Sequence, residues 1–258
     1  MESALSRNAA ERIAQTRSDS RGWKERLFFS IETFIVRIRY LSEIFNQGFA
    51  KSMSILAGWH FIKRCGIEGD YLEFGVFRGE TFRTSMIATK KIFNKNQPFS
   101  GRFLAFDSFE GLPKVASLHN EKNIFLEGEY SASVEVFFKT LGPLGKNQKI
   151  EIIKGWFNKT LNEKTLQDLK LTKAAFVNID CDLYESTVDV LNFIYPIIRT
   201  GTVIYFDDWF CHKGAMDEGE ALACYEWLSR HPDIKLVDYR NVGVYGKMFI
   251  VNRSISMN

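Results

Sequence analysis

The sequence lacks the features that mark zinc-ribbon, disulfide-stabilised and nucleic-acid-binding proteins. None of its four cysteines forms a Cys-x-x-Cys pair, which argues against a structural zinc site and against a disulfide framework. Lysine and arginine number 34 against 31 aspartates and glutamates, and they form no basic stripe, so we expect no nucleic-acid partner. Free thiols are typical of a reducing cytoplasm, which is the location we expect.

A long uncharged hydrophobic run is also missing. The N-terminal residues contain no apolar core of a secretory signal, and the most apolar early stretch, 27–45, is interrupted by Glu32, Arg37, Arg39 and Glu43. This stretch therefore falls short of the roughly 18 uncharged residues of a membrane span. We interpret it as an amphipathic helix that packs on the main domain, on a second subunit or on a membrane surface. Its mixed charges favour the first two.

What the sequence does contain, after a helical pattern over 23–66, is an alternation of short apolar segments with longer helical patterns. Strands alternating with helices predict an α/β fold with a parallel sheet covered on both faces. The last two apolar segments are joined too tightly for a parallel crossover, so we expect the final strand to be antiparallel. The expected strands are 71–76, 102–107, 149–155, 174–180, 201–207, 234–240 and 247–252. The expected helices between them are 80–94, 131–141, 159–170, 185–198 and 215–230.

One connection, 108–130, is long for a loop inside a compact domain. Its aromatic residues, Phe109, Phe125 and Tyr130, argue against a plain disordered loop. We predict that it forms a lid over a pocket, with a simple insertion as the alternative.

The residues after the first expected strand form a glycine-containing turn. Ligands of open α/β sheets bind beyond the carboxyl ends of the strands, and glycine lets the backbone approach them closely. Gly75 and Gly79 lack the Gly-x-Gly-x-x-Gly spacing of nicotinamide-binding folds, and an ordinary tight turn is the alternative. Glu73, just before the turn, would repel a phosphate but could pair with an ammonium group.

Two further strand ends carry residues suited to a nucleoside. Asp107 ends the second strand, where a carboxylate could bind ribose hydroxyls, although a helix cap or a solvated strand end is the alternative. Trp156 follows Gly155 after the third strand and could stack on a flat base or pack in the core.

The fourth and fifth strands end in acids. Asp180 lies one strand–helix–strand unit before the adjacent Asp207 and Asp208. Three converging carboxylates with no lysine or arginine nearby in sequence would repel one another, and a hard divalent cation such as Mg²⁺, Ca²⁺ or Mn²⁺ would relieve this repulsion. We expect Asp182 to cap the next helix instead. His212, just past the acid pair, is a candidate acid/base group, with a solvated loop histidine as the alternative.

Five segments, taken in order, resemble the macrocin O-methyltransferase family, whose members methylate sugar hydroxyls with S-adenosylmethionine. The segments are YLEFGVFRGETF, LAFDSFEGLP, KGWFNKTL, NIDCDLYEST and GTVIYFDDWF, and the likeness covers about residues 68–252. It implies a Rossmann-like class I methyltransferase fold, with a seven-stranded, mostly parallel sheet and an antiparallel last strand. It also implies a methyltransferase domain, 67–258, and an N-terminal helical extension, 1–66, that packs across subunits of a homo-oligomer and contributes to the acceptor pocket.

The resemblance also implies a role for individual residues. Asp180 matches the position proposed as the general base, and we keep His212 as a second catalytic candidate. The metal ligands, for Mg²⁺ or another hard divalent cation, would be Asp180, Asp207 and Asp208. The residues that would bind S-adenosylmethionine are Glu73, Gly75, Val76, Gly79, Thr81, Asp107, Ser108, Gly155, Trp156 and Asp180.

We therefore expect an enzyme that methylates a hydroxyl of a sugar-containing small molecule by in-line displacement. A cation that chelates two adjacent hydroxyls would acidify one of them, and Asp180 or His212 would take its proton. Three alternatives stay open. The first is a methyltransferase that needs no metal or acts on nitrogen or carbon. The second is a non-catalytic binding protein of the same fold. The third is a Rossmann-type nucleotide-sugar enzyme, which the glycine spacing disfavours.

Overall fold

The computed structural model divides the chain into two compact units, residues 1–49 and 50–258. In the first unit the described residues are helical, and the sheet and the cavity belong to the second. The residues that the structure describes are 30, 33–35, 47–94, 96–114, 125–146 and 149–254. Most of the predicted helical pattern before residue 47, and the middle of the predicted lid, 115–124, lie outside them.

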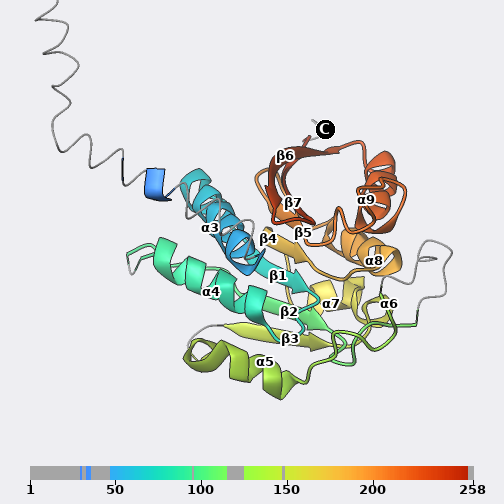
Figure 1. The fold of residues 1–258 in the computed structure, drawn as a ribbon, viewed down its shortest axis with the longest axis horizontal. Helices are drawn as coiled ribbons and strands as arrows, with labels where there is room; N and C mark the ends of the chain where they lie inside the picture. The colour runs from blue at the N-terminus through green and yellow to red at the C-terminus, as the bar shows by residue number, and fades with distance from the viewer. Residues whose placement is uncertain are drawn as a thin grey trace, which may run out of the picture. The chain divides into compact units, whose positions relative to one another are not determined.

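A seven-stranded sheet forms the centre of the second unit, with the strand order β3-β2-β1-β4-β5-β7-β6 (Figure 1). Neighbouring strands are parallel except for β7, which is antiparallel to both β5 and β6. The predicted α/β fold and its antiparallel last strand are therefore confirmed. The strands are β1 (Asp70–Phe74), β2 (Phe103–Asp107), β3 (Ile150–Lys154), β4 (Ala174–Ile179), β5 (Val203–Phe206), β6 (Ile234–Val242) and β7 (Gly246–Arg253).

Helices cover both faces of this sheet, as expected for parallel strands whose apolar residues point both ways. All six residues of β4 and all four of β5 are buried. One apolar core cluster joins the sheet to α8 and α9, and a second joins it to α3, α4 and α5. The helices are α3 (Gln47–Cys65), α4 (Glu80–Ile92), α5 (Val134–Leu141), α6 (Phe157–Thr160), α7 (Glu163–Asp168), α8 (Tyr184–Ile194) and α9 (Gly219–Arg230), with the 3₁₀ helix η2 (Gly142–Lys146) after α5.

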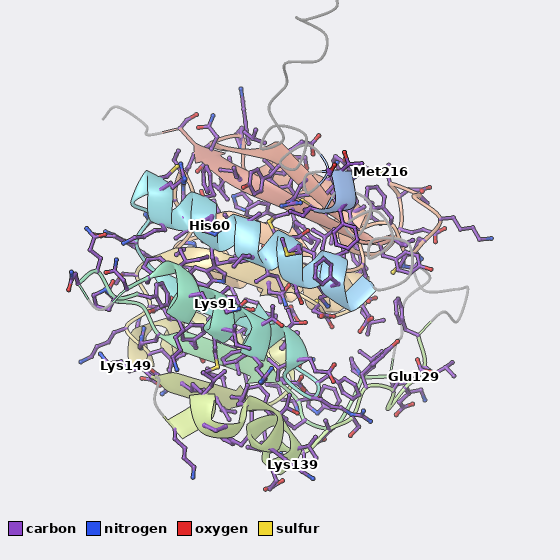
Figure 2. The ribbon with its side chains drawn as sticks, turned by 60° about the vertical axis from the view of Figure 1, so that its left-hand side comes forward. His60, Lys91, Glu129, Lys139, Lys149 and Met216 are labelled. Atoms are coloured by element: carbon purple, nitrogen blue, oxygen red, sulfur yellow. The ribbon has the colours of Figure 1, made fainter. Side chains whose placement is uncertain are left out.

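Helix α3 packs closely on the sheet through Trp59, which is fully buried. Its ring lies 5.4 Å from that of Phe176 and 5.8 Å from that of Tyr71. A Cβ on Gly58 would lie 2.9 Å from the ring of Phe176, so glycine permits this approach. In Figure 2, α3 (His60), α4 (Lys91) and α5 (Lys139) lie side by side over this face. None of the described helices is long and apolar enough to cross a membrane.

Two local predictions differ from the structure. The pattern over 159–170 forms two short helices, because the side chain of Asn162 accepts a hydrogen bond from the backbone of Thr165 and starts a new helix. Asp182 does not cap α8, whose N-cap is Leu183, without a side-chain cap. Asp182 has a φ of +61° and lies in the turn between β4 and α8.

Candidate active site

A cavity of about 610 Å³ opens at the carboxyl ends of β1, β2, β3, β4 and β5. It gathers most of the residues singled out from the sequence, although they come from five separate strand ends. Gly79 and His212 are not among the residues that line it. The predicted site residues that do line it are Glu73, Gly75, Val76, Thr81, Asp107, Ser108, Gly155, Trp156, Asp180, Asp207 and Asp208.

The turn between β1 and α4 forms one wall of this cavity. Gly75 has a φ of +83°, and a Cβ there would lie 1.7 Å from the carbonyl oxygen of Asp180. Only glycine fits at this position. Gly79, with a φ of +87°, instead packs against the ring of Phe137 on α5, where a Cβ would lie 2.6 Å from it. Gly79 therefore shapes the turn from behind the cavity wall.

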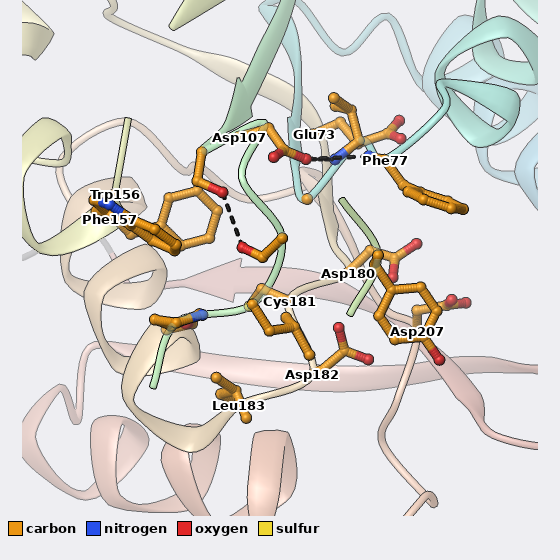
Figure 3. Close-up of a pocket in the computed structure, with 18 of the residues that line it drawn as sticks. Glu73, Phe77, Asp107, Trp156, Phe157, Asp180, Cys181, Asp182, Leu183 and Asp207 are labelled. Atoms are coloured by element: carbon orange, nitrogen blue, oxygen red, sulfur yellow. Dashed lines mark hydrogen bonds between the residues drawn. The ribbon is translucent and has the colours of Figure 1, made fainter. Parts of the chain in front are cut away.

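Asp107 braces this turn (Figure 3). Its Oδ2 accepts hydrogen bonds from the backbone N–H groups of Val76, at 2.7 Å, and Phe77, at 3.0 Å. Its Oδ1 accepts one from the backbone of Phe109, at 2.6 Å. A carboxylate offers about four lone-pair sites, so Asp107 keeps capacity for a ligand hydroxyl. The side chain thus acts as a cap of the turn and still faces the cavity.

Glu73 is an acid in the middle of the sheet, with only 1% of its surface exposed. Burial raises its pKa to about 8, although a hydrogen bond from the Tyr71 hydroxyl and the charge of Lys51 pull it down. A buried carboxylate without a full counter-charge is costly. An ammonium group entering the cavity would supply that charge.

One end of the cavity, next to the carboxyl end of β3, is lined by aromatic side chains. Figure 3 shows Trp156 and Phe157 together, across the pocket from Asp180 and Asp207. Gly155, with a φ of +143°, turns the chain there after β3. The two rings offer a flat apolar surface on which a base could stack.

Several acids lie at the other end, and we call Asp180, Asp207 and Asp208 the aspartate cluster. Asp182 also lines the cavity beside them. One carboxylate oxygen from each lies within 4.8 Å of the other two. Burial and the charge of Asp207 raise the pKa of both Asp180 and Asp208. Oδ2 of Asp208 is buried without a hydrogen-bond partner, while Oδ1 accepts from the thiol of Cys211 at 2.9 Å.

These observations fit a hard divalent cation. Oxygens bind Mg²⁺ or Ca²⁺ at about 2.0–2.6 Å, so ligands on opposite sides of an ion lie roughly 4–5 Å apart, which is the spread seen here. The unpartnered oxygen of Asp208 could serve as one of these ligands. Burial raises the pKa values of Asp180 and Asp208 most, and the charge of Asp207 raises them further, so a cation at this position would offset both effects.

A lysine, which the sequence reasoning missed, also reaches the cluster. Nζ of Lys51, on helix α3, lies 2.7 Å from Oδ2 of Asp207 and 3.2 Å from Oδ2 of Asp180. Burial alone would lower the pKa of Lys51, but the two carboxylates outweigh it and raise the pKa. One signal was present in the sequence, because Lys51 is the only charged residue between Glu43 and Lys63.

A buried glutamate supports the cluster from behind. Glu220, on α9, accepts a hydrogen bond from the backbone of Asp208 at 3.0 Å and is 1% exposed. Burial and the charge of Asp208 raise its pKa. Glu220 thereby fixes the backbone that carries the acid pair.

His212 lies away from the residues that line the cavity. Its Nδ1 is 2.9 Å from a carboxylate oxygen of Glu218, and its ring rests on Gly219. The rings of Phe125 and His212 are arranged in a T shape, with centroids 6.4 Å apart. Its proposed acid/base role remains a prediction, and Asp180 is the candidate base that lies inside the cavity.

The ends of the predicted lid come together beside the site. The backbone of Leu112 exchanges hydrogen bonds with the 128–129 segment, donating to Glu129 at 2.9 Å and accepting from Gly128 at 3.0 Å. Tyr130 then lines the cavity, with its ring edge-on to Phe77 at 5.7 Å. The 115–124 segment and its His119 lie outside the described residues.

This strand order, with a glycine turn after the first strand and a cavity at the carboxyl ends, defines a class I methyltransferase fold. The O-methyltransferase NovP has the same fold, with a TM-score of 0.60, 20% identity and 80% of each chain covered. The chain belongs to the macrocin O-methyltransferase family, because the sequence model described as Macrocin-O-methyltransferase (TylF) matches residues 54–242. The expected family resemblance is therefore confirmed.

Two curated relatives carry more specific names. An 8-demethyl-8-(2,3-dimethoxy-alpha-L-rhamnosyl)-tetracenomycin-C 4'-O-methyltransferase of Streptomyces olivaceus is 29% identical over 56% of this chain and 54% of its own. A mycinamicin III 3''-O-methyltransferase of Micromonospora griseorubida is 28% identical over 70% of this chain and 69% of its own. The match thus spans little more than half of the first relative's length.

Proposed function

We propose that this protein transfers the methyl group of S-adenosylmethionine to a hydroxyl group of a sugar-containing small molecule, with the help of a hard divalent cation. The observation that carries the proposal is the aspartate cluster, which shares one cavity with the glycine turn after β1. Membership of the macrocin O-methyltransferase family supports the same chemistry.

The cavity offers complementary partners for each part of S-adenosylmethionine. Glu73 would pair with the ammonium of its methionine part, and Asp107, with its remaining lone pair, would accept from a ribose hydroxyl. Trp156 and Phe157 would stack on the adenine ring. When bound, S-adenosylmethionine supplies an activated methyl group on sulfur.

The aspartate cluster would hold the cation next to this methyl group. A bound divalent cation lowers the pKa of a hydroxyl that it contacts, which makes an alcohol a usable nucleophile near neutral pH. Asp180 would accept the hydroxyl proton, because its carboxylate lines the cavity beside the position proposed for the cation. Phe77 and Tyr130 provide an aromatic surface against which a sugar ring could lie and be oriented.

A specific observation favours a second candidate, a metal-independent O-methyltransferase. Lys51 already compensates part of the charge of the aspartate cluster through its contacts with Asp180 and Asp207. In this candidate its ammonium would hold the two carboxylates in place of a metal ion.

The proposal is tested by methyl transfer from labelled S-adenosylmethionine to a panel of glycosides that carry adjacent hydroxyls. We expect transfer with Mg²⁺, loss of transfer in EDTA and recovery when Mg²⁺ is restored. Asp208→Asn should lower turnover by more than the roughly 10–100-fold that outer contacts of metal sites typically cost, while binding of S-adenosylhomocysteine is retained. Asp217→Asn, at an exposed position of the same loop, is the matched control.

Two results would contradict the proposal in different ways. Full transfer in EDTA would favour the metal-independent candidate. Failure to bind S-adenosylhomocysteine under any condition would refute methyl transfer by either route.

The remaining expectations belong to the same proposal. A homo-oligomer, a contribution of the N-terminal extension to the acceptor pocket and a cytoplasmic location follow from the family resemblance and from the unpaired cysteines. Analytical ultracentrifugation of the protein with and without residues 1–49 tests the first, and a comparison of the glycoside KM of the two proteins tests the second.

A further inference from the structure

We propose that Lys51 is a resident counter-cation of the aspartate cluster, and that a divalent cation must displace it to bind. This inference rests on the metal part of the proposed function. It concerns a residue to which the resemblance assigns no role.

The geometry shows that the lysine and a metal ion would compete for the same oxygens. Nζ of Lys51 lies between the carboxylates of Asp180 and Asp207, at 3.2 and 2.7 Å from one oxygen of each. A metal ion that used these two oxygens would lie at about 2.0–2.6 Å from both, in the region where the ammonium now lies. The two cations would also repel each other strongly at this separation.

The ion pair is partly buried, and no other lysine or arginine competes for it in the described part of the chain. The side chain of Lys51 is 25% exposed, and those of Asp180 and Asp207 are 26% and 23% exposed. Within the described ranges, no other lysine or arginine forms an ion pair with the aspartate cluster. Lys51 therefore supplies the positive charge that offsets the repulsion between Asp180 and Asp207.

The charges show why the pairing is incomplete. One ammonium faces the three carboxylates of the aspartate cluster, and Asp182 adds a fourth acid to the same cavity. The third member of the cluster, Asp208, keeps an unpartnered buried oxygen. A divalent ion would compensate the cluster better and could use that oxygen as well. Lysine suits an exchange of this kind, because its charge sits on a flexible four-carbon stem that can move away without moving the helix.

The exchange has two opposite consequences. The lysine stabilises the metal-free protein, since without it the cluster would hold three close carboxylates with no cation. It also weakens metal binding, because the ion must first break two charged hydrogen bonds. Removing the positive charge should therefore make the metal-free protein less stable and the metal-bound state relatively more favourable.

The test measures divalent-ion binding directly, without any turnover. Titration calorimetry with Mg²⁺ and with Mn²⁺ gives the Kd for wild type and for the neutral variants Lys51→Met and Lys51→Gln. Thermal melting in EDTA gives the Tm of each metal-free protein. Lys63→Met is the control, because Lys63 lies on the same helix and donates to Gln97, outside the cavity.

We expect both neutral variants to bind the ions about tenfold more tightly than wild type, a typical size for coupling between two ligands. We also expect a lower Tm in EDTA and a larger rise on adding metal. Lys63→Met should match the wild-type Kd. If a neutral variant binds Mg²⁺ or Mn²⁺ and wild type binds neither ion measurably, the exchange is supported in its strongest form.

Two outcomes would overturn the inference. If the neutral variants bind the ions as wild type does, or more weakly, Lys51 does not compete and the exchange is wrong, although the metal site stands. If neither wild type nor the variants bind any divalent ion, while methyl transfer proceeds in EDTA, the exchange and the metal part of the proposed function are both wrong.

Discussion

The Cα of Gly75 faces the carbonyl oxygen of Asp180 so closely that a Cβ would lie 1.7 Å from that oxygen. The turn proposed to hold the methionine part of the cofactor therefore touches the backbone that carries a proposed metal ligand. A shift of either segment must move the other, so the proposed cofactor site and the proposed metal site cannot change position independently.

This contact predicts that Gly75→Ala damages the site. The methyl group would force β1 and β4 apart at their ends, and the residue would also be strained at a φ of +83°. We expect a loss of stability well above the roughly 1–2 kcal/mol of left-handed strain alone, and weaker binding of S-adenosylhomocysteine. Urea unfolding and calorimetry measure the two effects.

Gly214→Ala is the matched control. Gly214 also has a positive φ, +76°, but nothing lies within 4 Å of its Cβ position. It should lose only the strain energy and keep cofactor affinity. Equal losses in the two variants would show that the contact with Asp180 is unimportant.

Glu73 predicts a pH dependence of stability. Its pKa rises from the ordinary 4.5 to about 8 in the folded protein, so between these values the folded state holds a proton that the unfolded chain releases. The stability that this proton contributes is fully present below pH 4.5 and is lost as the pH rises through 8. Urea unfolding between pH 6 and 9 should show a steeper loss for wild type than for Glu73→Gln.

The same carboxyl predicts proton release on cofactor binding. An ammonium group favours charged Glu73, so binding of S-adenosylhomocysteine below pH 8 should release a proton from it. Calorimetry in buffers of different ionisation enthalpy measures this release. If Glu73→Gln releases as many protons as wild type, Glu73 does not pair with the ammonium.

The position of Tyr130 predicts that its substitution weakens binding of the acceptor without changing binding of the cofactor. Its ring stands edge-on to Phe77 at the cavity and is 52% exposed. Tyr130→Ala should raise the KM for the glycoside several-fold and leave the Kd of S-adenosylhomocysteine unchanged, since a stacked sugar ring loses one aromatic face. Leu126→Ala, a similarly exposed residue of the same segment at 54%, should change neither. An effect of Tyr130→Ala on the cofactor alone would contradict the lid interpretation.

The two candidate bases predict different kinetics. Asp180→Asn should abolish turnover, because Asp180 faces the cavity and belongs to the aspartate cluster. His212→Gln should keep most of kcat, because His212 is paired with Glu218 outside the cavity lining. Steady-state rates as a function of pH check both. A loss of kcat in His212→Gln with unchanged melting temperature would restore the histidine as the base.

The sequence was informative where strand ends carry unusual residues. Strand and helix patterns placed Asp180 and the Asp207–Asp208 pair at the ends of neighbouring parallel strands, and such ends meet at one edge of a sheet. The same argument placed Glu73 and Asp107 at the ends of neighbouring strands, β1 and β2, and in the structure Glu73 is in register with Ala105, two residues before Asp107. The spacing of apolar residues and the alternation of strands and helices are enough for such predictions, because neither depends on the details of side-chain packing.

The sequence failed where one packing contact or turn decides the outcome. Lys51 reaches Asp180 across 129 residues, through the way α3 packs on the sheet, and no local pattern encodes that distance. His212 misses the cavity because the chain turns after Asp208, with the backbone of Cys211 donating to the Asp208 carbonyl at 3.1 Å. Asp182 is not a cap because its φ is +61°.

The four thiols differ in a way that experiments can use. Cys65, at the end of α3, is exposed, while Cys181 and Cys224 are buried and Cys211 donates to Asp208. Burial raises the pKa of those three thiols and keeps them from forming the reactive thiolate. A maleimide dye should therefore attach to Cys65 of the natural sequence first, and would report on the helix that carries Lys51 without any engineered cysteine.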